Sequence, residues 1–123
     1  MAEKELRGFE DLECYQLGRQ VLHEAYRIAA SLPPEEKYNL NDQLRRAGVS
    51  IVLNIAEGYG RYHFLDCIRF YYIARGSIME VLSGLIACDD LHYTKDENSR
   101  QRELCHSALR ALNGYIRYVH GQQ

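Results

Sequence analysis

The chain has 123 residues, a length typical of one domain; 46% are apolar and 26% charged, which excludes a disordered or fibrous protein. The formal net charge of −2 lacks the basic excess typical of a generic nucleic-acid binder. The N-terminus has no signal-peptide pattern, and no run approaches the ~18 apolar residues of a membrane span. We therefore expect one domain over residues 1–123, located in the cytoplasm and without membrane contact.

No stretch alternates apolar and polar residues over the length of a strand, which predicts an all-α chain. The first helix covers about 22 residues, and Pro33 and Pro34 end it. Its inward residues are Leu12, Tyr15, Leu22, Ala25, Ala29 and Leu32. We expect Asn41 to cap a second helix that runs to about Glu57. Its predicted core face consists of Leu44, Ala47, Gly48, Ile51, Ile55 and Gly58.

The segment NIAEGYGRYH, residues 54–63, contains Gly-x-Gly-Arg and suggests two interpretations, a phosphate-binding loop or a helix end. Phosphate loops follow a strand or carry Gly-Lys-Ser/Thr, and neither is present. The pattern therefore favours a helix end, with Gly58 left-handed just beyond it and Arg61 near the exposed carbonyls. We expect Glu57 to accept a charge-assisted hydrogen bond from Arg61 or Arg75.

The third helix is predicted from about Phe64 to Asp89 and carries two apolar stripes. The core stripe is Phe64, Ile68, Tyr71, Ile78, Leu82 and Leu85. The second stripe is Phe70, Ile73, Ala74, Ser77, Val81 and Gly84. So wide an apolar face exceeds what one bundle seam needs, so we expect the second stripe to be buried against another subunit. The predicted subunit interface is Phe70, Ile73, Ala74, Val81 and Gly84.

The segment Thr94-Lys95-Asp96-Glu97 has the pattern of a capping box and predicts the start of a fourth helix. This helix turns Leu104, Ala108, Ala111, Leu112, Tyr115 and Val119 inward. Four amphipathic helices with short connections indicate a four-helix bundle.

Patterns for a metal, a cofactor or a catalytic centre are weak. The four cysteines are far apart and fall in helical patterns, which predicts reduced core thiols. The histidines are not spaced to share a helical turn as metal ligands would. Two clusters resemble catalytic ones, Glu57 beside Asn54 and Asp89-Asp90 with His92, but neither has a nucleophile with a base at helical spacing. We expect no enzyme, no cofactor and no metal.

The order QLRRAGVSIVLNIAEGYGR, residues 43–61, resembles the 23S rRNA intervening-sequence protein family of small bacterial four-helix-bundle proteins. Residues 36–40 before it and Phe70, Ala74-Arg75-Gly76-Ser77 and Glu80 after it extend the resemblance to about residues 9–118. The chain departs from the family at Val52, where proline is common, without consequence for the fold. The resemblance implies an up-down-up-down left-handed bundle that assembles into a ring-like homopentamer. The motif residues are expected to be structural: Ser50, Asn54, Glu57, Gly58, Arg75, Gly76 and Ser77.

The resemblance also bears on function. Some family members are encoded inside intervening sequences of ribosomal RNA genes, and the related accessory variability protein of diversity-generating retroelements binds nucleic acid and a reverse transcriptase. The first hypothesis is a non-catalytic homo-oligomeric scaffold that binds RNA or an RNA-processing protein. Its candidate nucleic-acid contacts are Arg45, Arg46, Arg61, Tyr59 and Tyr62, and the last helix adds Arg100, Arg102, Arg110 and Arg117. The alternative is a purely protein-binding module of a small genetic element, which the net acidity favours.

Overall fold

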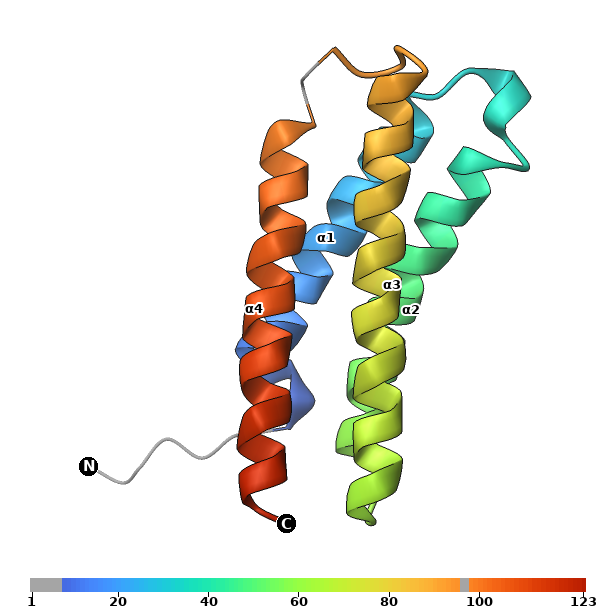
Figure 1. Cartoon of the computed structure of the whole chain (residues 1–123). Helices are drawn as coiled ribbons and strands as arrows, with labels where there is room; N and C mark the ends of the chain where they lie inside the picture. Colours follow the sequence, from blue (N-terminus) through green and yellow to red (C-terminus); the bar gives the residue numbers. More distant parts are fainter. Residues whose placement is uncertain (1–7, 96–97) are drawn as a thin grey trace.

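The structure is a computed structural model that describes residues 8–95 and 98–123. This part of the chain contains no strand; its elements are η1 (Phe9–Asp11), α1 (Glu13–Ala30), η2 (Pro34–Glu36), α2 (Leu40–Tyr59), α3 (Phe64–Asp90) and α4 (Ser99–Gly121). Figure 1 shows the four long helices side by side, with the start of α1 and the end of α4 at the same end of the bundle. Each helix packs against the next in sequence, and α1 also packs against α4. The all-α class and the four-helix bundle are confirmed.

The helices approach closely where glycine faces a neighbouring helix. A Cβ added at Gly18 of α1 would lie 2.9 Å from Ile51 of α2, and one at Gly84 of α3 would lie 2.8 Å from Leu44 of α2. Both distances are shorter than the ~3.5 Å of an ordinary carbon contact. These glycines therefore let α2 pack tightly between α1 and α3.

The start of α2 differs from the prediction, because Asn41 does not cap the helix. The helix begins at Leu40, one residue before Asn41. The Asn41 amide instead donates to the Ala29 carbonyl at 3.0 Å, and its Oδ1 accepts from Arg45 Nε at 2.7 Å. The buried Glu36 carboxylate accepts the free Leu40 amide at 3.3 Å. The acceptor for the helix start thus comes from the preceding 3₁₀ turn.

The start of α4 also differs from the predicted capping box. Residues 96–97 of that box lie outside the described part of the chain. Thr94 does not cap α4, which begins only at Ser99. The Thr94 hydroxyl instead accepts from the Asn98 amide at 3.0 Å, and the same amide donates to the Leu85 carbonyl at 2.7 Å. The buried Asn98 therefore ties the start of α4 to α3.

Gly58 lies inside α2, which continues to Tyr59, and it is not left-handed. Among the described glycines, positive φ occurs at Gly8 alone. The predicted left-handed position is therefore wrong. Close packing with α3 explains the glycine instead, because a Cβ there would lie 2.6 Å from Tyr71 Cε1 and 3.0 Å from the Cys67 carbonyl oxygen.

The second apolar stripe of α3 packs largely against α2 of the same chain. Three of its members are buried: Ala74, Ser77 and Val81. Gly84 lies against Leu44 of α2. The bundle itself covers Ala74 and Val81, whereas Gly84 is partly exposed, and the predicted subunit interface stays a prediction. Of the predicted interface, Ile73 remains 45% exposed and Phe70 remains half-buried.

Candidate functional site

A groove of about 410 Å³ lies along the outer face of α2, beside α1. Its lining residues are Tyr26, Arg45, Arg46, Val49, Ser50, Leu53 and Asn54. The structure therefore brings two predicted nucleic-acid contacts together with two residues of the family motif. Sequence reasoning missed Tyr26, a residue of α1 that is 43% exposed. We call this site the α2 groove.

Two guanidinium groups and one carboxylate set the charge at one end of the α2 groove. The side chains of Arg45 and Arg46 approach Asp42 at 3.8 and 3.7 Å. Charge-assisted hydrogen bonds are typically 2.7–2.9 Å long, so both contacts are loose. The Arg46 side chain is 79% exposed. Two cations against one carboxylate leave a surplus positive charge beside an exposed aromatic ring.

A small network of polar side chains lies between α2 and α3. The hydroxyl oxygens of Ser50 and Ser77 lie 2.7 Å apart and share a hydrogen bond. The Asn54 amide donates to the Ser50 carbonyl at 2.8 Å and to the Ser50 hydroxyl at 2.9 Å. Ser50 and Ser77 thus join the two helices, and Asn54 holds the Ser50 hydroxyl from within α2.

Glu57 and Arg61 form the hydrogen bond expected from the sequence, with Arg61 donating to Glu57 at 2.6 Å. Arg75, the other expected donor, instead donates to Asn113 of α4 at 3.4 Å. The side chains of Glu57 and Arg61 are 50% and 44% exposed, so this ion pair contributes less than about 1 kcal/mol to stability. Arg61 also lies over the Phe70 ring, 4.8 Å from its centroid, which ties the end of α2 to α3.

The other predicted nucleic-acid contacts lie away from the α2 groove. Tyr59 is the last residue of α2, roughly 21 Å along the helix from Arg45 at about 1.5 Å per residue, and Arg61 and Tyr62 follow beyond the helix end. Tyr62 is 93% exposed, whereas Tyr59 is 36% exposed. The predicted set therefore divides into two clusters, and the one around Arg45 lies in a groove.

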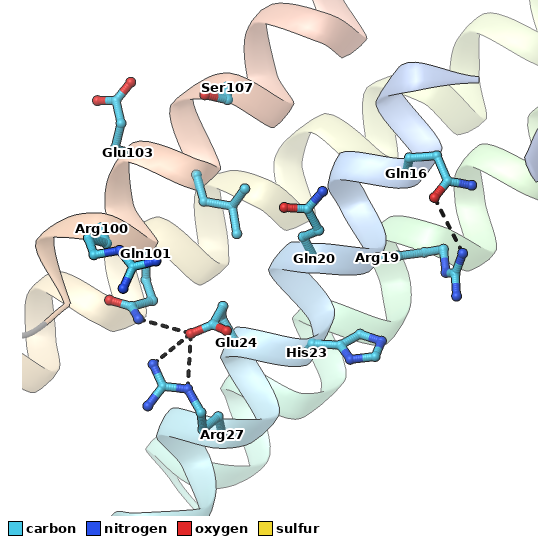
Figure 2. Close-up of a pocket in the computed structure, with 11 residues that line it drawn as sticks. Gln16, Arg19, Gln20, His23, Glu24, Arg27, Arg100, Gln101, Glu103 and Ser107 are labelled. Atoms are coloured by element: carbon cyan, nitrogen blue, oxygen red, sulfur yellow. Dashed lines mark hydrogen bonds and ion pairs between the residues drawn. The ribbon is translucent and has the colours of Figure 1, made fainter. Parts of the chain in front are cut away.

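A larger groove of about 880 Å³ lies on the surface where α1 and α4 meet (Figure 2). Charges of both signs line it: Arg19, Arg27, Arg100, Glu24 and Glu103. Figure 2 shows Arg27 and Gln101 converging on the Glu24 carboxylate, with bonds of 2.6 and 2.9 Å. Both hydrogen bonds lower the pKa of Glu24, and the bond from Arg27 has the larger effect. Among the described residues, no tyrosine or phenylalanine lines this groove, whereas the α2 groove combines its arginines with Tyr26.

The family model of the 23S rRNA-intervening sequence protein matches residues 10–114, which include the α2 groove and the whole motif. The chain belongs to this family. The resemblance drawn from residues 43–61 is therefore confirmed. A comparison with curated proteins found no match.

In this intervening-sequence family protein, two of the α4 arginines are paired with carboxylates, one of α3 and one of α4 itself. Arg102 pairs with Asp89 of α3 at 3.4 Å, and Arg110 pairs with Glu103 at 3.2 Å. Among the residues that the structure describes, no three histidine, cysteine, aspartate or glutamate side chains gather as metal ligands. None of the described helices combines the length and the apolar character needed to cross a bilayer.

Proposed function

We propose that this chain is a non-catalytic, homo-oligomeric scaffold of the cytoplasm that binds single-stranded RNA through the α2 groove. The observation that supports this proposal is that Arg45, Arg46 and Tyr26 line the same groove. Arginines contact phosphates without regard to sequence, and exposed aromatic rings stack on unpaired bases. The groove, at about 410 Å³, falls within the range of small-ligand sites and suits one nucleotide. The family's name supports a connection with RNA.

The charge of the chain sets the expected strength and salt dependence. Two phosphate contacts on a single strand give a slope of log K against log salt of about −1.4, at roughly −0.7 per contact. Raising the salt concentration fourfold should therefore weaken binding about sevenfold. The net charge of −2 opposes nonspecific attraction, so a detectable complex requires a defined site.

Fluorescence anisotropy with a labelled 12-nucleotide single-stranded RNA at 50 and 200 mM salt tests the proposal. We expect the double variant Arg45→Gln with Arg46→Gln to bind RNA more weakly at low salt and with a flatter salt dependence. We expect Tyr26→Ala to weaken RNA binding at both salt concentrations. Arg19→Gln with Arg100→Gln, in the groove between α1 and α4, removes the same charge and serves as the control. No binding at 50 mM salt, or an equal loss in the control, contradicts the proposal.

The oligomeric part of the proposal rests on the family resemblance, which implies an up-down-up-down left-handed bundle in a ring of five copies. The packing of each helix on its sequence neighbours, and of α1 on α4, supports that bundle. Ile73, which is 45% exposed, and the half-buried Phe70 offer an apolar contact for a second copy. We expect Ile73→Arg to break the assembly without unfolding it. Light scattering that gives 14.3 kDa for the unmodified protein contradicts the oligomer.

The second candidate function is a protein-binding module without nucleic-acid contact. The net charge of −2 favours it. An apolar protein interface weakens little with salt, so a salt-insensitive complex with a partner protein, together with no RNA binding, would favour this alternative.

A further inference from the structure

Asn54, which lines the α2 groove, presents only a hydrogen-bond acceptor there. Its side-chain nitrogen donates to the Ser50 carbonyl at 2.8 Å and to the Ser50 hydroxyl at 2.9 Å. A side-chain amide nitrogen carries two hydrogens, so both are used within α2. The remaining atom, Oδ1, has no donor among the described residues and is not buried. A ligand in the groove can therefore reach that oxygen.

The backbone of α2 fixes the orientation of the Asn54 amide. Turning the side chain over would place its oxygen 2.8 Å from the Ser50 carbonyl oxygen, and two acceptors at that distance repel each other. The oxygen and nitrogen of an asparagine are assigned from such partners. Because the Ser50 carbonyl can only accept, Oδ1 is the atom that faces away from it.

The Ser50 hydroxyl has no hydrogen left for a ligand. It lies 2.7 Å from the Ser77 hydroxyl, which lies 3.1 Å from the Ile73 carbonyl oxygen. A hydrogen can take either direction between two hydroxyls, but the Ile73 carbonyl can only accept. Both hydroxyl hydrogens are used when Ser50 donates to Ser77 and Ser77 donates to Ile73. Ser50 and Asn54 therefore offer a ligand acceptors and no donor.

The guanidinium donors lie at the other end of the α2 groove. Arg46 precedes Asn54 by eight residues, roughly 12 Å along the helix at about 1.5 Å per residue. Val49 and Leu53 line the groove between them along α2. The Tyr26 hydroxyl can both donate and accept, so it suits any base edge. The groove thus has a cationic end suited to phosphate, apolar side chains in the middle and an acceptor at the far end.

We propose that the α2 groove selects a base with an exocyclic amine over uracil, and that Asn54 determines this specificity. The inference rests on the proposed RNA binding, in which the arginines hold a phosphate and a base lies towards Asn54. Cytosine has its N4 amine, a donor, where uracil has its O4 carbonyl, an acceptor. The single ring N–H of uracil lies between two carbonyl oxygens, which an acceptor repels. Opposite Asn54 Oδ1, the amine gains a hydrogen bond that uracil does not.

Adenine also carries an exocyclic amine and belongs to the preferred class. Asparagine usually pairs with adenine through two hydrogen bonds, one of which its side-chain nitrogen donates. In this chain Ser50 already accepts both hydrogens of that nitrogen, so Asn54 contributes a single bond to either base. One net hydrogen bond changes affinity by about fivefold.

Oligo(C) and oligo(U) of 12 nucleotides are the matched probes, because both are single-stranded pyrimidine RNAs of equal charge. By fluorescence anisotropy at 50 mM salt, we expect the unmodified protein to bind oligo(C) about fivefold more tightly than oligo(U). A third RNA of the same length has 2-pyrimidinone in place of cytosine, which removes the amine without adding bulk. We expect it to bind as weakly as oligo(U).

Asn54→Ala should lower the ratio of the oligo(C) affinity to the oligo(U) affinity to about one, chiefly by weakening oligo(C) binding. A merely structural role of Asn54 would weaken both RNAs equally and leave the ratio unchanged. Asn113→Ala, the same substitution on α4 outside the groove, should keep the ratio of the unmodified protein. Arg45→Gln with Arg46→Gln should weaken both RNAs and also keep the ratio, because phosphate contacts carry no sequence information.

The outcomes separate this inference from the proposed function. Equal binding of oligo(C) and oligo(U), equal binding of oligo(C) and the 2-pyrimidinone RNA, or an unchanged ratio in Asn54→Ala overturns the inference while RNA binding stands. Failure of all three RNAs to bind contradicts the proposed function and the inference with it.

Discussion

Replacing Gly58 by alanine tests the crossing of α2 and α3. The new Cβ would lie 2.6 and 2.9 Å from two ring carbons of Tyr71 and 3.0 Å from the Cys67 carbonyl oxygen. Ordinary carbon contacts are about 3.5–4.0 Å, so the overlap with the ring is about 1 Å. Tyr71 cannot retreat easily, because it is 2% exposed and packs edge to face on Tyr115 at 5.3 Å. The helices must therefore move apart or the ring must leave its rotamer.

Two opposing effects set the magnitude. Alanine in a helix interior is favoured over glycine by about 1 kcal/mol. Overpacking a filled core costs about 1–3 kcal/mol, and the upper part of that range applies because one of the contacts is to backbone. We expect Gly58→Ala to lower the free energy of unfolding by about 1–2 kcal/mol. For a chain of this length that corresponds to a fall in Tm of roughly 4–8 °C.

Thermal unfolding followed by circular dichroism measures the effect, and Gly76→Ala is the matched control. A Cβ at Gly76 meets nothing within 4 Å, so that variant should gain about 0.5–1 kcal/mol from helix propensity alone. The two substitutions are chemically the same and should shift Tm in opposite directions. A Gly58→Ala protein that melts at or above the unmodified protein would refute the reasoning.

Two further predictions concern titratable groups. The Tyr93 hydroxyl donates to the Glu36 carboxylate at 2.7 Å, and this hydrogen bond lowers the pKa of Glu36. The bond therefore stabilises the folded protein at pH values above the unfolded pKa of about 4.3, and this stabilisation is lost as pH falls through the folded pKa. Glu36→Gln should therefore lower Tm at pH 7, and the difference from the unmodified protein should shrink as pH falls through the folded pKa of Glu36; a difference that stays constant down to acid unfolding would contradict this. Burial raises the pKa of three thiols: Cys14 and Cys88 to about 11, and Cys105 to about 12. At pH 8 we expect iodoacetamide to modify the half-buried Cys67 before the three buried thiols, as measured by mass spectrometry. Rapid labelling of the Cys67→Ser variant at its remaining cysteines would contradict this.

The helices were predictable from the sequence because each has an apolar face with a clear period. The predicted ends at Glu57 and Asp89 lie within two residues of the observed ones. The helix starts were less predictable. Asn41 has a good capping side chain, yet the amide at the helix start donates to the Glu36 carboxylate instead. Glu36 belongs to a 3₁₀ turn, which apolar periodicity does not predict. A cap depends on the path of the preceding chain as well as on residue type.

The candidate site was only partly predictable for a similar reason. Arg45 and Arg46 were identifiable as exposed cations on the polar side of α2. Tyr26 belongs to α1, and its position beside them depends on how closely α1 and α2 approach. That approach is set by Gly48, where a Cβ would lie 3.2 to 3.3 Å from atoms of α1. A single helical pattern carries no such distance, so the groove appears only when the two helices are placed together.

The third helix shows why counting apolar stripes does not locate an interface. Its sequence is apolar on more than two sides, and the stripe that seemed surplus is covered by α2 because Gly84 and Ser77 permit close contact. The uncovered side chains lie on the opposite flank, where Leu65, Tyr72, Met79 and Ile86 follow a period of seven. Close approach of a neighbouring helix, rather than the number of apolar residues, therefore decides which stripe is buried.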